Sequence, residues 1–246
     1  VDREVIEKAT QLKVIGRAGV GVDNVDVDAA TECGVLVMNS PGGSTTTTAE
    51  HTIAMLFALA RNIPQACQTL KSHQWERNKF KGVELAGKTL GVIVLGRIGS
   101  EVARKCHSMG MTVVGYDPFI NPDAHLSSGL SMVPLDQIYS QADFITVHSP
   151  LTDETRNLIN KDAFAQMKTG VRLLNCARGG IISETDLYEA LKSGRVAGAA
   201  FDVFETEPNT ESPLLTLDNF IATPHLGAST LEAQRKVSED ICRQVA

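Results

Sequence analysis

The sequence predicts an α/β protein built on a doubly wound parallel sheet, and three observations predict it. Segments with strand-like and helix-like patterns alternate regularly from residue 89 onward. Several of the strand-like segments are apolar at nearly every position, which is typical of a parallel sheet covered by helices on both faces. A glycine-rich turn joins the first of these strands to a helix, as in folds that bind a ligand at the carboxyl ends of their strands.

The alternation defines the elements in order. Strands are predicted over residues 89–95, 112–116, 143–147, 171–175, 197–203 and 220–222. Helices are predicted between most of them, over residues 98–109, 135–140, 161–166 and 184–192. On the first of these helices Ile98, Val102, Cys106 and Met109 recur at the 3.6-residue period, so this face is expected in the core.

The first part of the chain predicts a helix over 2–9, a strand over 12–15, a helix over 27–33 and a strand over 35–38. Roughly 40 residues in two βα units cannot close a core of their own, so we expect an earlier piece of this domain to be missing.

A long helix is predicted over residues 47–61, because its residues are apolar on nearly every side, which is typical of a buried helix. The threonines Thr45 to Thr48 are expected to provide its N-cap. The polar stretch 73–84 that follows is predicted to be a surface excursion.

Composition excludes several classes of protein. The net charge is −6, and no stretch gathers the basic residues into a stripe, so nucleic-acid binding is not expected. The longest apolar run, 53–60, is far shorter than the ~20 residues that span a bilayer, so no membrane partner is expected. The 5 cysteines are scattered and suggest reduced thiols in a cytoplasmic protein, and histidine spacing indicates no metal.

The turn after the 89–95 strand predicts a Rossmann-like nucleotide site. Gly96, Arg97, Ile98 and Gly99 lead from this strand directly into a helix, whose N-terminus stabilises a pyrophosphate. Asp117 follows the next strand about 20 residues later, where a carboxylate binds the adenosine ribose and favours NAD over NADP. The alternative is that these glycines only pack a helix against a strand.

Val94 departs from this fingerprint, because it stands where the first glycine is expected. A β-branched residue at positive φ is an outlier. We therefore expect the turn to be remodelled or the backbone at Val94 to be extended, and NAD to bind with lowered affinity.

Arg178, Glu207 and His225 each follow a different strand end, and together they predict a catalytic group. Oxidation of a secondary alcohol needs a base for the hydroxyl proton, and histidine titrates near neutrality. Glu207 is positioned to orient the imidazole, and Arg178 offers a fork for a carboxylate. Taken singly, each residue also has a structural explanation: Arg178 as a surface ion pair, Glu207 as a solvated loop charge and His225 as a core histidine. His148 is expected to be structural, and Cys176 a small filler beside the site.

Four stretches resemble the D-isomer-specific 2-hydroxyacid dehydrogenase family: GRAGVGVDN from Gly16, NCARGG from Asn175, DVFETEP from Asp202 and PHLGAS from Pro224. The resemblance runs from about Leu12 to the end of the chain. It implies that residues 1–42 are part of a flavodoxin-like substrate domain that lacks its beginning. It further implies an NAD-binding domain over 43–228 and a helix over 229–246 that returns toward the substrate domain.

The same resemblance implies the roles of individual residues. It matches Arg178, Glu207 and His225 to the catalytic arginine, glutamate and histidine. The positions expected to contact NAD are Val20, Gly96, Arg97, Ile98, Gly99, Asp117, Ser149, Cys176, Ala177, Arg178, Asp202, His225, Gly227 and Ala228. The positions expected to bind substrate are Arg17, Val20, Gly21 and Arg77, and Arg77 is expected to reach the substrate phosphate of a neighbouring subunit.

The activity that the resemblance implies is NAD-dependent oxidation of 3-phospho-D-glycerate by a homodimer or homotetramer. Two alternatives remain open. Within the family, the enzyme could instead reduce glyoxylate or hydroxypyruvate. From another class, the same fold serves as a nucleotide-sensing corepressor that binds partner proteins.

Overall fold

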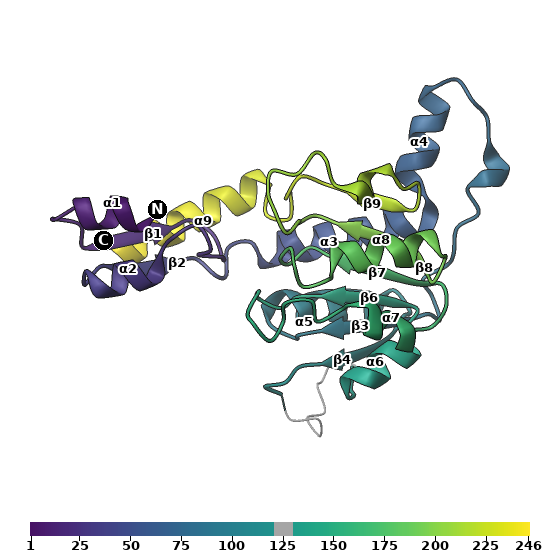
Figure 1. The fold of residues 1–246 in the computed structure, drawn as a ribbon, viewed down its shortest axis with the longest axis horizontal. Helices are drawn as coiled ribbons and strands as arrows, with labels where there is room; N and C mark the ends of the chain where they lie inside the picture. Colours follow the sequence, from purple (N-terminus) through teal and green to yellow (C-terminus); the bar gives the residue numbers. More distant parts are fainter. Residues whose placement is uncertain (121–129) are drawn as a thin grey trace. The chain divides into compact units, whose positions relative to one another are not determined.

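The computed structural model describes residues 1–120 and 130–246, which form two compact units (Figure 1). One unit consists of Val1–Thr48 together with Ala228–Ala246, and the other of Ala49–Gly227. The larger unit contains both the glycine-rich turn and the three predicted catalytic residues. The assignment of 1–42, 43–228 and 229–246 to a substrate domain, a nucleotide domain and a returning helix stays a prediction.

The larger unit is built on a seven-stranded parallel sheet with the strand order β5-β4-β3-β6-β7-β8-β9, which confirms the predicted doubly wound fold. The order reverses direction between β3 and β6, and a doubly wound sheet binds its ligand at such a point. The strands are β3 (Thr89–Ile93), β4 (Thr112–Tyr116), β5 (Ser131–Met132), β6 (Phe144–Val147), β7 (Val171–Asn175), β8 (Val196–Phe201) and β9 (Phe220–Ala222).

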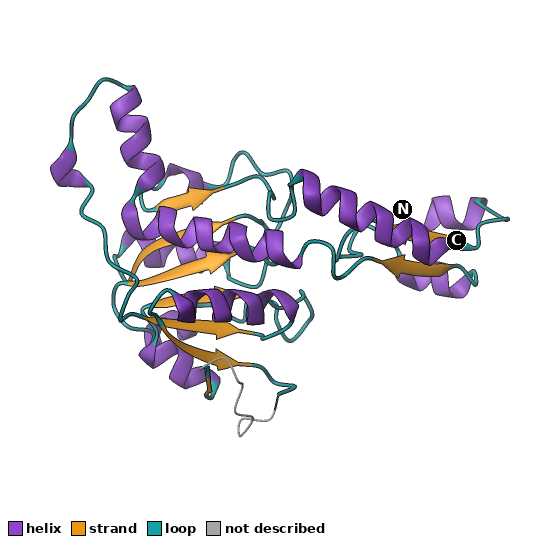
Figure 2. Ribbon diagram, turned by 180° about the vertical axis from the view of Figure 1, so that it is seen from behind, coloured by secondary structure: helices purple, strands orange, loops and turns teal. Residues whose placement is uncertain are grey.

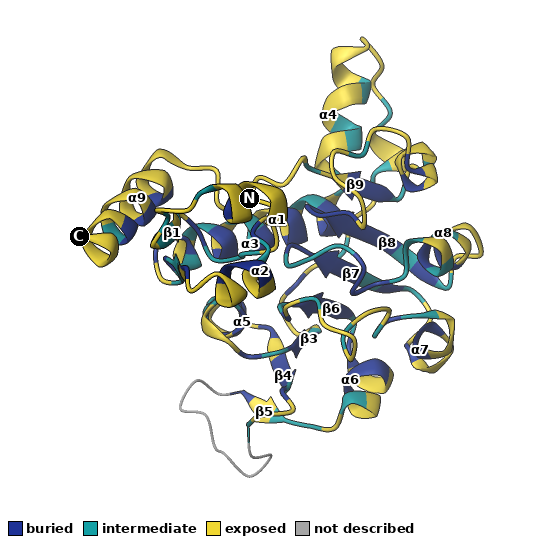
Figure 3. Ribbon diagram, turned by 60° about the vertical axis from the view of Figure 1, so that its left-hand side comes forward, coloured by how far each residue is buried: buried dark blue, intermediate teal, exposed yellow. Residues whose placement is uncertain are grey.

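Helices cover both faces of this sheet, as the apolar strands predict (Figure 2). One face packs against α3 (Thr45–Arg61) and α5 (Arg97–Ser108), and the other against α6 (Leu135–Gln141), α7 (Lys161–Gln166) and α8 (Glu184–Lys192). Neighbouring strand residues alternate between the two layers: Phe144 belongs to the first and Ile145 to the second. Figure 3 shows these strands buried between helices whose outer faces are exposed.

The smaller unit pairs β1 (Val14–Arg17) with β2 (Leu36–Asn39) in a two-stranded parallel sheet. Its helices are α1 (Arg3–Lys8), α2 (Val27–Glu32) and α9 (Leu231–Val245). Ile6, Ala29 and Val35 form its small core, while α9 contributes Val237 and Ile241, which are also buried.

The region around α3 differs from the prediction. The helix begins at Thr45, so the threonines lie inside its first turn and do not cap it. A second helix, α4 (Ile63–Lys71), follows at once and was not predicted, although Ile63, Ala66, Cys67 and Leu70 recur at helical spacing; none of its residues is buried. The stretch 73–84 is a surface excursion as predicted, with a short 3-10 turn, η1 (Arg77–Lys79).

Several predicted strands are too long or displaced. β3 ends at Ile93 and β8 at Phe201, because the residues that follow leave the sheet to form loops. β1 and β2 lie later in the chain than residues 12–15 and 35–38, and β5 was missed because it has only 2 residues. Among the described residues, no helix is both long enough and apolar enough to cross a membrane.

Candidate active site

Three loops at the carboxyl edge of the sheet are tied together by hydrogen bonds. Asn175, fully buried at the end of β7, accepts the Ala177 backbone N–H and donates to the Arg178 carbonyl. Its own carbonyl accepts the Asp202 N–H at 2.9 Å, and the Asp202 carbonyl accepts the His225 N–H at 2.9 Å. The loops after β7, β8 and β9 are therefore held in one continuous network, and each carries one of the predicted catalytic residues.

His225 and Glu207 form a direct pair. The His225 Nδ1 lies 2.7 Å from the Glu207 Oε2, and the other carboxylate oxygen accepts the Phe204 backbone N–H at 3.0 Å. The imidazole remains half exposed, with 51% of its side-chain surface open to solvent. His225 is not the core histidine that the alternative interpretation required, and Glu207 is not an unengaged loop charge. Because Nδ1 faces the carboxylate, Nε2 is the nitrogen available to a substrate.

Arg178 lies beside the same pair of loops. The next residue, Gly179, packs against the backbone of Phe204 and Glu205 so closely that an added Cβ would lie 1.9 Å from the Phe204 carbonyl carbon. Only glycine allows this approach, which joins the Arg178 loop to the Glu207 loop. The Arg178 side chain is half-buried and donates from Nη1 to the Ala177 carbonyl at 2.7 Å.

Asp202, predicted to contact NAD, directs its carboxylate to protein groups. It is 1% exposed, and it accepts the backbone N–H of Leu226 and of Gly227, each at 2.7 Å. Burial alone would raise the pKa of this carboxyl, but hydrogen bonds from His51, Thr223 and Leu226 outweigh it, so the pKa lies below its usual value. Asp202 therefore braces, as an anion, the loop that carries His225.

The glycine-rich turn has the features of a pyrophosphate site. Gly96 precedes the first residue of α5, is exposed and faces open space, since nothing lies within 4 Å of where its Cβ would be. No side chain of the described residues caps this helix, so backbone N–H groups of its first turn remain available to an anion. At Gly99 an added Cβ would lie 2.2 Å from the Val94 carbonyl oxygen, so this glycine allows the helix to pack against the strand end.

Val94 occupies the conformation that a glycine would adopt, with φ at 70°. The expected remodelled turn or extended backbone at this position is wrong. The Val94 N–H donates to the Tyr116 carbonyl at 2.7 Å, and its half-buried side chain packs on the sheet core. These contacts hold a β-branched residue in the left-handed region, at a cost of about 1–3 kcal/mol.

Asp117 lies next to this turn at the end of β4. One carboxylate oxygen accepts the Leu95 N–H at 2.8 Å and the other accepts the Phe119 N–H at 2.9 Å. Each oxygen keeps a second lone pair for another donor. The carboxylate thus fixes the turn in place, and its predicted bond to the ribose stays a prediction.

Buried polar atoms beside the turn lack partners among the described residues. They are the Nδ1 of His148 and the Oγ of Ser149, which follow β6 directly. Burial lowers the pKa of His148 to about 4, so its imidazole is neutral at pH 7. Buried groups of this kind normally find a hydrogen-bond partner, and a bound dinucleotide would supply one. The Gly96 turn and these atoms fit the predicted NAD.

Cys176 and Ala177 follow β7 on the same edge. Cys176 is buried, and burial raises the pKa of its thiol to about 12, with the nearby Asp202 acting in the same direction. The thiol is therefore neutral and unreactive at pH 7, in agreement with the predicted small filler.

The remaining predicted residues do not belong to this network. Arg17, Val20 and Gly21 lie in the smaller unit, where the Val20 carbonyl accepts from the Asn39 side chain at 2.6 Å. Ala228 also belongs to that unit, and Arg77 lies on the surface excursion after α4. No group of three or more metal-ligating side chains gathers in the described ranges 1–120 and 130–246.

Sequence reasoning missed Asn175, His51 and Thr223 as members of the site. Asn175 carries a detectable signal in the sequence. An amide side chain at the end of an apolar strand is expected to be buried, and a buried amide needs hydrogen-bond partners, which the adjoining loops can supply. His51 lies on α3, far from the strand ends in sequence, and the pattern of that helix gives no indication that it reaches Asp202.

The sheet and its glycine turn define a dinucleotide-binding α/β domain, and comparison with known proteins identifies the family. Residues 53–227 match the family model described as D-isomer specific 2-hydroxyacid dehydrogenase, NAD binding domain. The chain therefore belongs to the D-isomer specific 2-hydroxyacid dehydrogenases, as its motifs predict, and NAD is the cofactor of this domain.

Individual relatives agree with this family. The chain is 53% identical over 246 residues to D-3-phosphoglycerate dehydrogenase of Methanocaldococcus jannaschii, covering 100% of this chain and 47% of the relative. It thus spans about half the length of the curated relatives it matches. A glyoxylate reductase structure from Paecilomyes thermophila shares 34% identity at a TM-score of 0.90, covering 99% of this chain and 74% of that one. The structure of an NAD-dependent formate dehydrogenase from Staphylococcus aureus in complex with NAD shares 36% sequence identity at a TM-score of 0.90. The match covers 100% of this chain and 75% of that one.

Proposed function

We propose that this protein catalyses NAD-dependent oxidation of 3-phospho-D-glycerate at C2 to 3-phosphohydroxypyruvate, the first step of L-serine biosynthesis. The observation that carries the proposal is the 2.7 Å pair of His225 and Glu207, on loops joined to that of Arg178 at the carboxyl edge of a dinucleotide-binding sheet. The relative in Methanocaldococcus jannaschii, named D-3-phosphoglycerate dehydrogenase, supports this choice of substrate.

The chain's own residues perform the acid-base part of the reaction. His225 accepts the C2 hydroxyl proton at Nε2, because its Nδ1 is held by Glu207. Glu207 keeps this orientation through its second oxygen, which accepts the Phe204 N–H, and it stabilises the imidazolium that forms. Arg178 binds the substrate carboxylate and places C2 next to His225. Bound NAD supplies the acceptor for the hydride that leaves C2.

The phosphate of the substrate requires further basic groups. Arg17, the backbone of Val20 and Gly21, and Arg77 are proposed to bind the carboxylate and phosphate, following the family resemblance. Each arginine carries a fixed fork of donors that matches a phosphate. Arg77 is proposed to act on the substrate of a neighbouring subunit.

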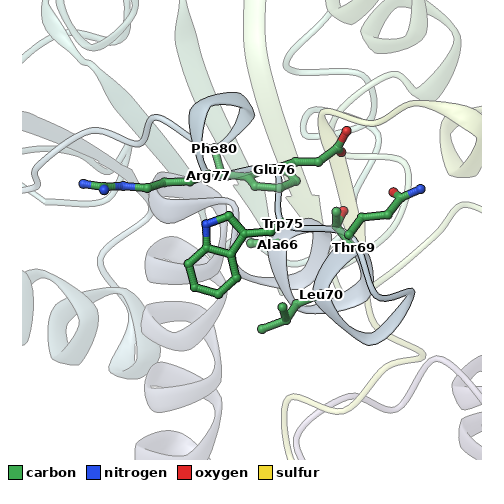
Figure 4. Close-up of a pocket in the computed structure, with 8 residues that line it drawn as sticks. Ala66, Thr69, Leu70, Trp75, Glu76, Arg77 and Phe80 are labelled. Carbon is green, nitrogen blue, oxygen red and sulfur yellow. The ribbon is translucent and has the colours of Figure 1, made fainter.

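The protein is proposed to be a homodimer or homotetramer, formed through α4 and the excursion that follows. Ile63, Leu70 and Trp75 are exposed there, with 81% of the surface of Trp75 open to solvent. Figure 4 shows the indole of Trp75 beside Ala66 and Leu70 in a shallow hollow, with the guanidinium of Arg77 extending away from them. Exposed aromatic and aliphatic groups of this kind are typical of a protein interface, and a second copy presents the same surface.

All five cysteines are free thiols, which supports the proposed location in the reducing cytoplasm.

The proposal is tested by NADH absorbance with the full-length protein. The substrates to compare are 3-phospho-D-glycerate and D-lactate with NAD, and glyoxylate and hydroxypyruvate with NADH. A kcat/KM for 3-phospho-D-glycerate at least tenfold above that for D-lactate supports the proposal. Faster turnover of glyoxylate would instead support the second candidate, a glyoxylate reductase, which the similarity to the Paecilomyes enzyme favours. Turnover with none of them would favour the corepressor-like sensor.

A further inference from the structure

His51 connects α3 to the loop that carries His225. Its Nε2 lies 3.1 Å from the Thr223 hydroxyl and 3.2 Å from the Asp202 carboxylate oxygen Oδ1. Its side chain is 19% exposed, so this imidazole is mostly enclosed by the protein. α3 also reaches this loop through Met55, whose Sδ lies 4.0 Å from the Thr223 hydroxyl oxygen.

The hydrogen positions in this cluster follow from its chemistry. The Thr223 hydroxyl donates its single hydrogen to Asp202 Oδ1 at 2.5 Å, so towards His51 it acts only as an acceptor. The carboxylate of Asp202 also accepts only, because it is ionised. Both contacts of His51 therefore require a hydrogen on Nε2, and His51 is a donor to both groups.

Both acceptors, Thr223 and Asp202, help to hold the loop that carries His225. Thr223 lies two residues before it, and Asp202 accepts the N–H groups of Leu226 and Gly227 directly after it. The His225 backbone itself is in the left-handed region, with φ at 56°, which costs energy for a non-glycine residue and needs surrounding contacts to hold it. Loss of the His51 donor would leave Thr223 and Asp202 short of one partner on the side facing α3.

We propose that His51 is a positioning residue for the proposed dehydrogenase reaction. By donating to Asp202 and Thr223, it fixes the segment 223–227 so that His225 stays oriented toward Glu207. The inference rests on the proposed function, since its effect is measured on the turnover that His225 carries out. A packing role alone for His51 is the competing explanation, because the side chain is also mostly enclosed by the protein.

The test compares two substitutions that separate donation from packing. His51→Leu keeps most of the volume and removes the donor, whereas His51→Gln places an amide N–H near the position of Nε2. His51→Leu is expected to lower kcat by about tenfold to a hundredfold, since small misplacements of a catalytic group cost rates of this size. His51→Gln is expected to stay within about threefold of the wild type, and the KM for NAD is expected to be unchanged in both.

Controls keep the outcome decisive. His107→Leu, a matched change on the exposed face of α5, is expected to leave kcat unchanged. If His51→Leu does not fold, His51→Asn replaces it, because asparagine is too short to reach Thr223 and Asp202. Equal rates for wild type and His51→Leu would overturn the inference, and so would equal impairment of the Gln variant and the donor-deficient variant. A wild-type protein that turns over none of the substrates would instead overturn the proposed function, so the two failures are distinguishable.

Discussion

The Nδ1 of His225 and the Oε2 of Glu207 lie 2.7 Å apart, although the residues come from loops that follow different strands. The pairing commits one imidazole nitrogen to the carboxylate and leaves Nε2 for the proposed proton transfer from the substrate. The Glu207 carboxylate is in turn fixed by the Phe204 N–H, so the protein itself holds the proposed proton acceptor and its support in one arrangement.

Glu207→Gln is expected to lower kcat by about a hundredfold, because an amide cannot stabilise the imidazolium that His225 is proposed to become. The KM for NAD should change little, since Glu207 is proposed to act only through the proton acceptor His225. Steady-state kinetics with NAD and the preferred substrate measure both. Glu205→Gln, a neighbouring exposed carboxylate, is the control and should behave as the wild type. A Glu207→Gln variant as active as this control would remove Glu207 from the mechanism.

Asp202→Asn is expected to destabilise the protein by about 2–4 kcal/mol. The amide turns one acceptor into a donor where backbone N–H groups of Leu226 and Gly227 point, so one of these groups loses its partner. Urea unfolding followed by circular dichroism measures the difference. An unchanged free energy of unfolding would show that the loop does not depend on this carboxylate.

The same residue predicts an acid dependence of stability. The pKa of Asp202 lies below its unfolded value of about 3.9, so its contribution is fully present above that pH. The contribution is lost as the pH falls through the lower folded pKa, because the unfolded state then takes up the proton first. In a pH series below about 4, the wild type should therefore lose more of its free energy of unfolding than Asp202→Asn. Parallel curves for both proteins would contradict this assignment.

Much of the fold could be predicted because the sheet is regular. The bounds of β9, α7 and α8 agree with the prediction. For the two helices, the apolar pattern begins directly after a capping side chain, Asn160 for α7 and Ser183 for α8. α4 was missed although its apolar residues recur at helical spacing; they face solvent, and its N-cap residue Asn62 makes no side-chain capping bond that would mark the start of a helix.

The site was predictable only in part. His225, Glu207 and Arg178 could be found because each follows a strand of one parallel sheet, and such strands end at a common edge. The support from His51 could not, because it depends on a side-chain direction that spacing does not determine. At Val94 the steric argument failed, since packing and the bond to Tyr116 hold a conformation that the residue alone avoids.

Trp75→Ser is expected to shift the proposed homo-oligomer toward the monomer. The indole is 81% exposed on the excursion after α4, and an aromatic residue at the centre of an interface contributes about 2 kcal/mol or more to association. Sedimentation velocity over a range of concentrations measures the shift. Phe119→Ser removes an exposed aromatic residue away from α4 and should leave the association unchanged. Equal effects of both substitutions would contradict an interface at Trp75.

Arg178→Lys is expected to lower kcat/KM for the hydroxy acid by about 10- to 100-fold. Lysine keeps the charge but loses the planar fork, and one charge-assisted hydrogen bond corresponds to about 1.5–3 kcal/mol. NADH affinity, followed by fluorescence, should stay within about twofold, because the lost bond is proposed to involve the substrate carboxylate. A loss confined to NADH binding would move Arg178 from the substrate to the cofactor.

Val94→Gly is expected to tighten NADH binding about fivefold. Glycine adopts a φ of 70° without strain, so the turn geometry that the pyrophosphate requires becomes easier to hold. A fivefold gain in affinity corresponds to about 1 kcal/mol of relieved strain. Titration of NADH fluorescence measures the dissociation constants.

Val94→Ala separates backbone strain from side-chain bulk at this turn. Alanine removes the two methyl groups that pack on the core but keeps a Cβ at positive φ, so most of the strain remains. If strain limits binding, the alanine variant should bind NADH as the wild type does while the glycine variant binds more tightly. Equal tightening in both would assign the effect to the volume of Val94 beside the cofactor, and looser binding by Val94→Gly would show that the valine packing holds the turn together.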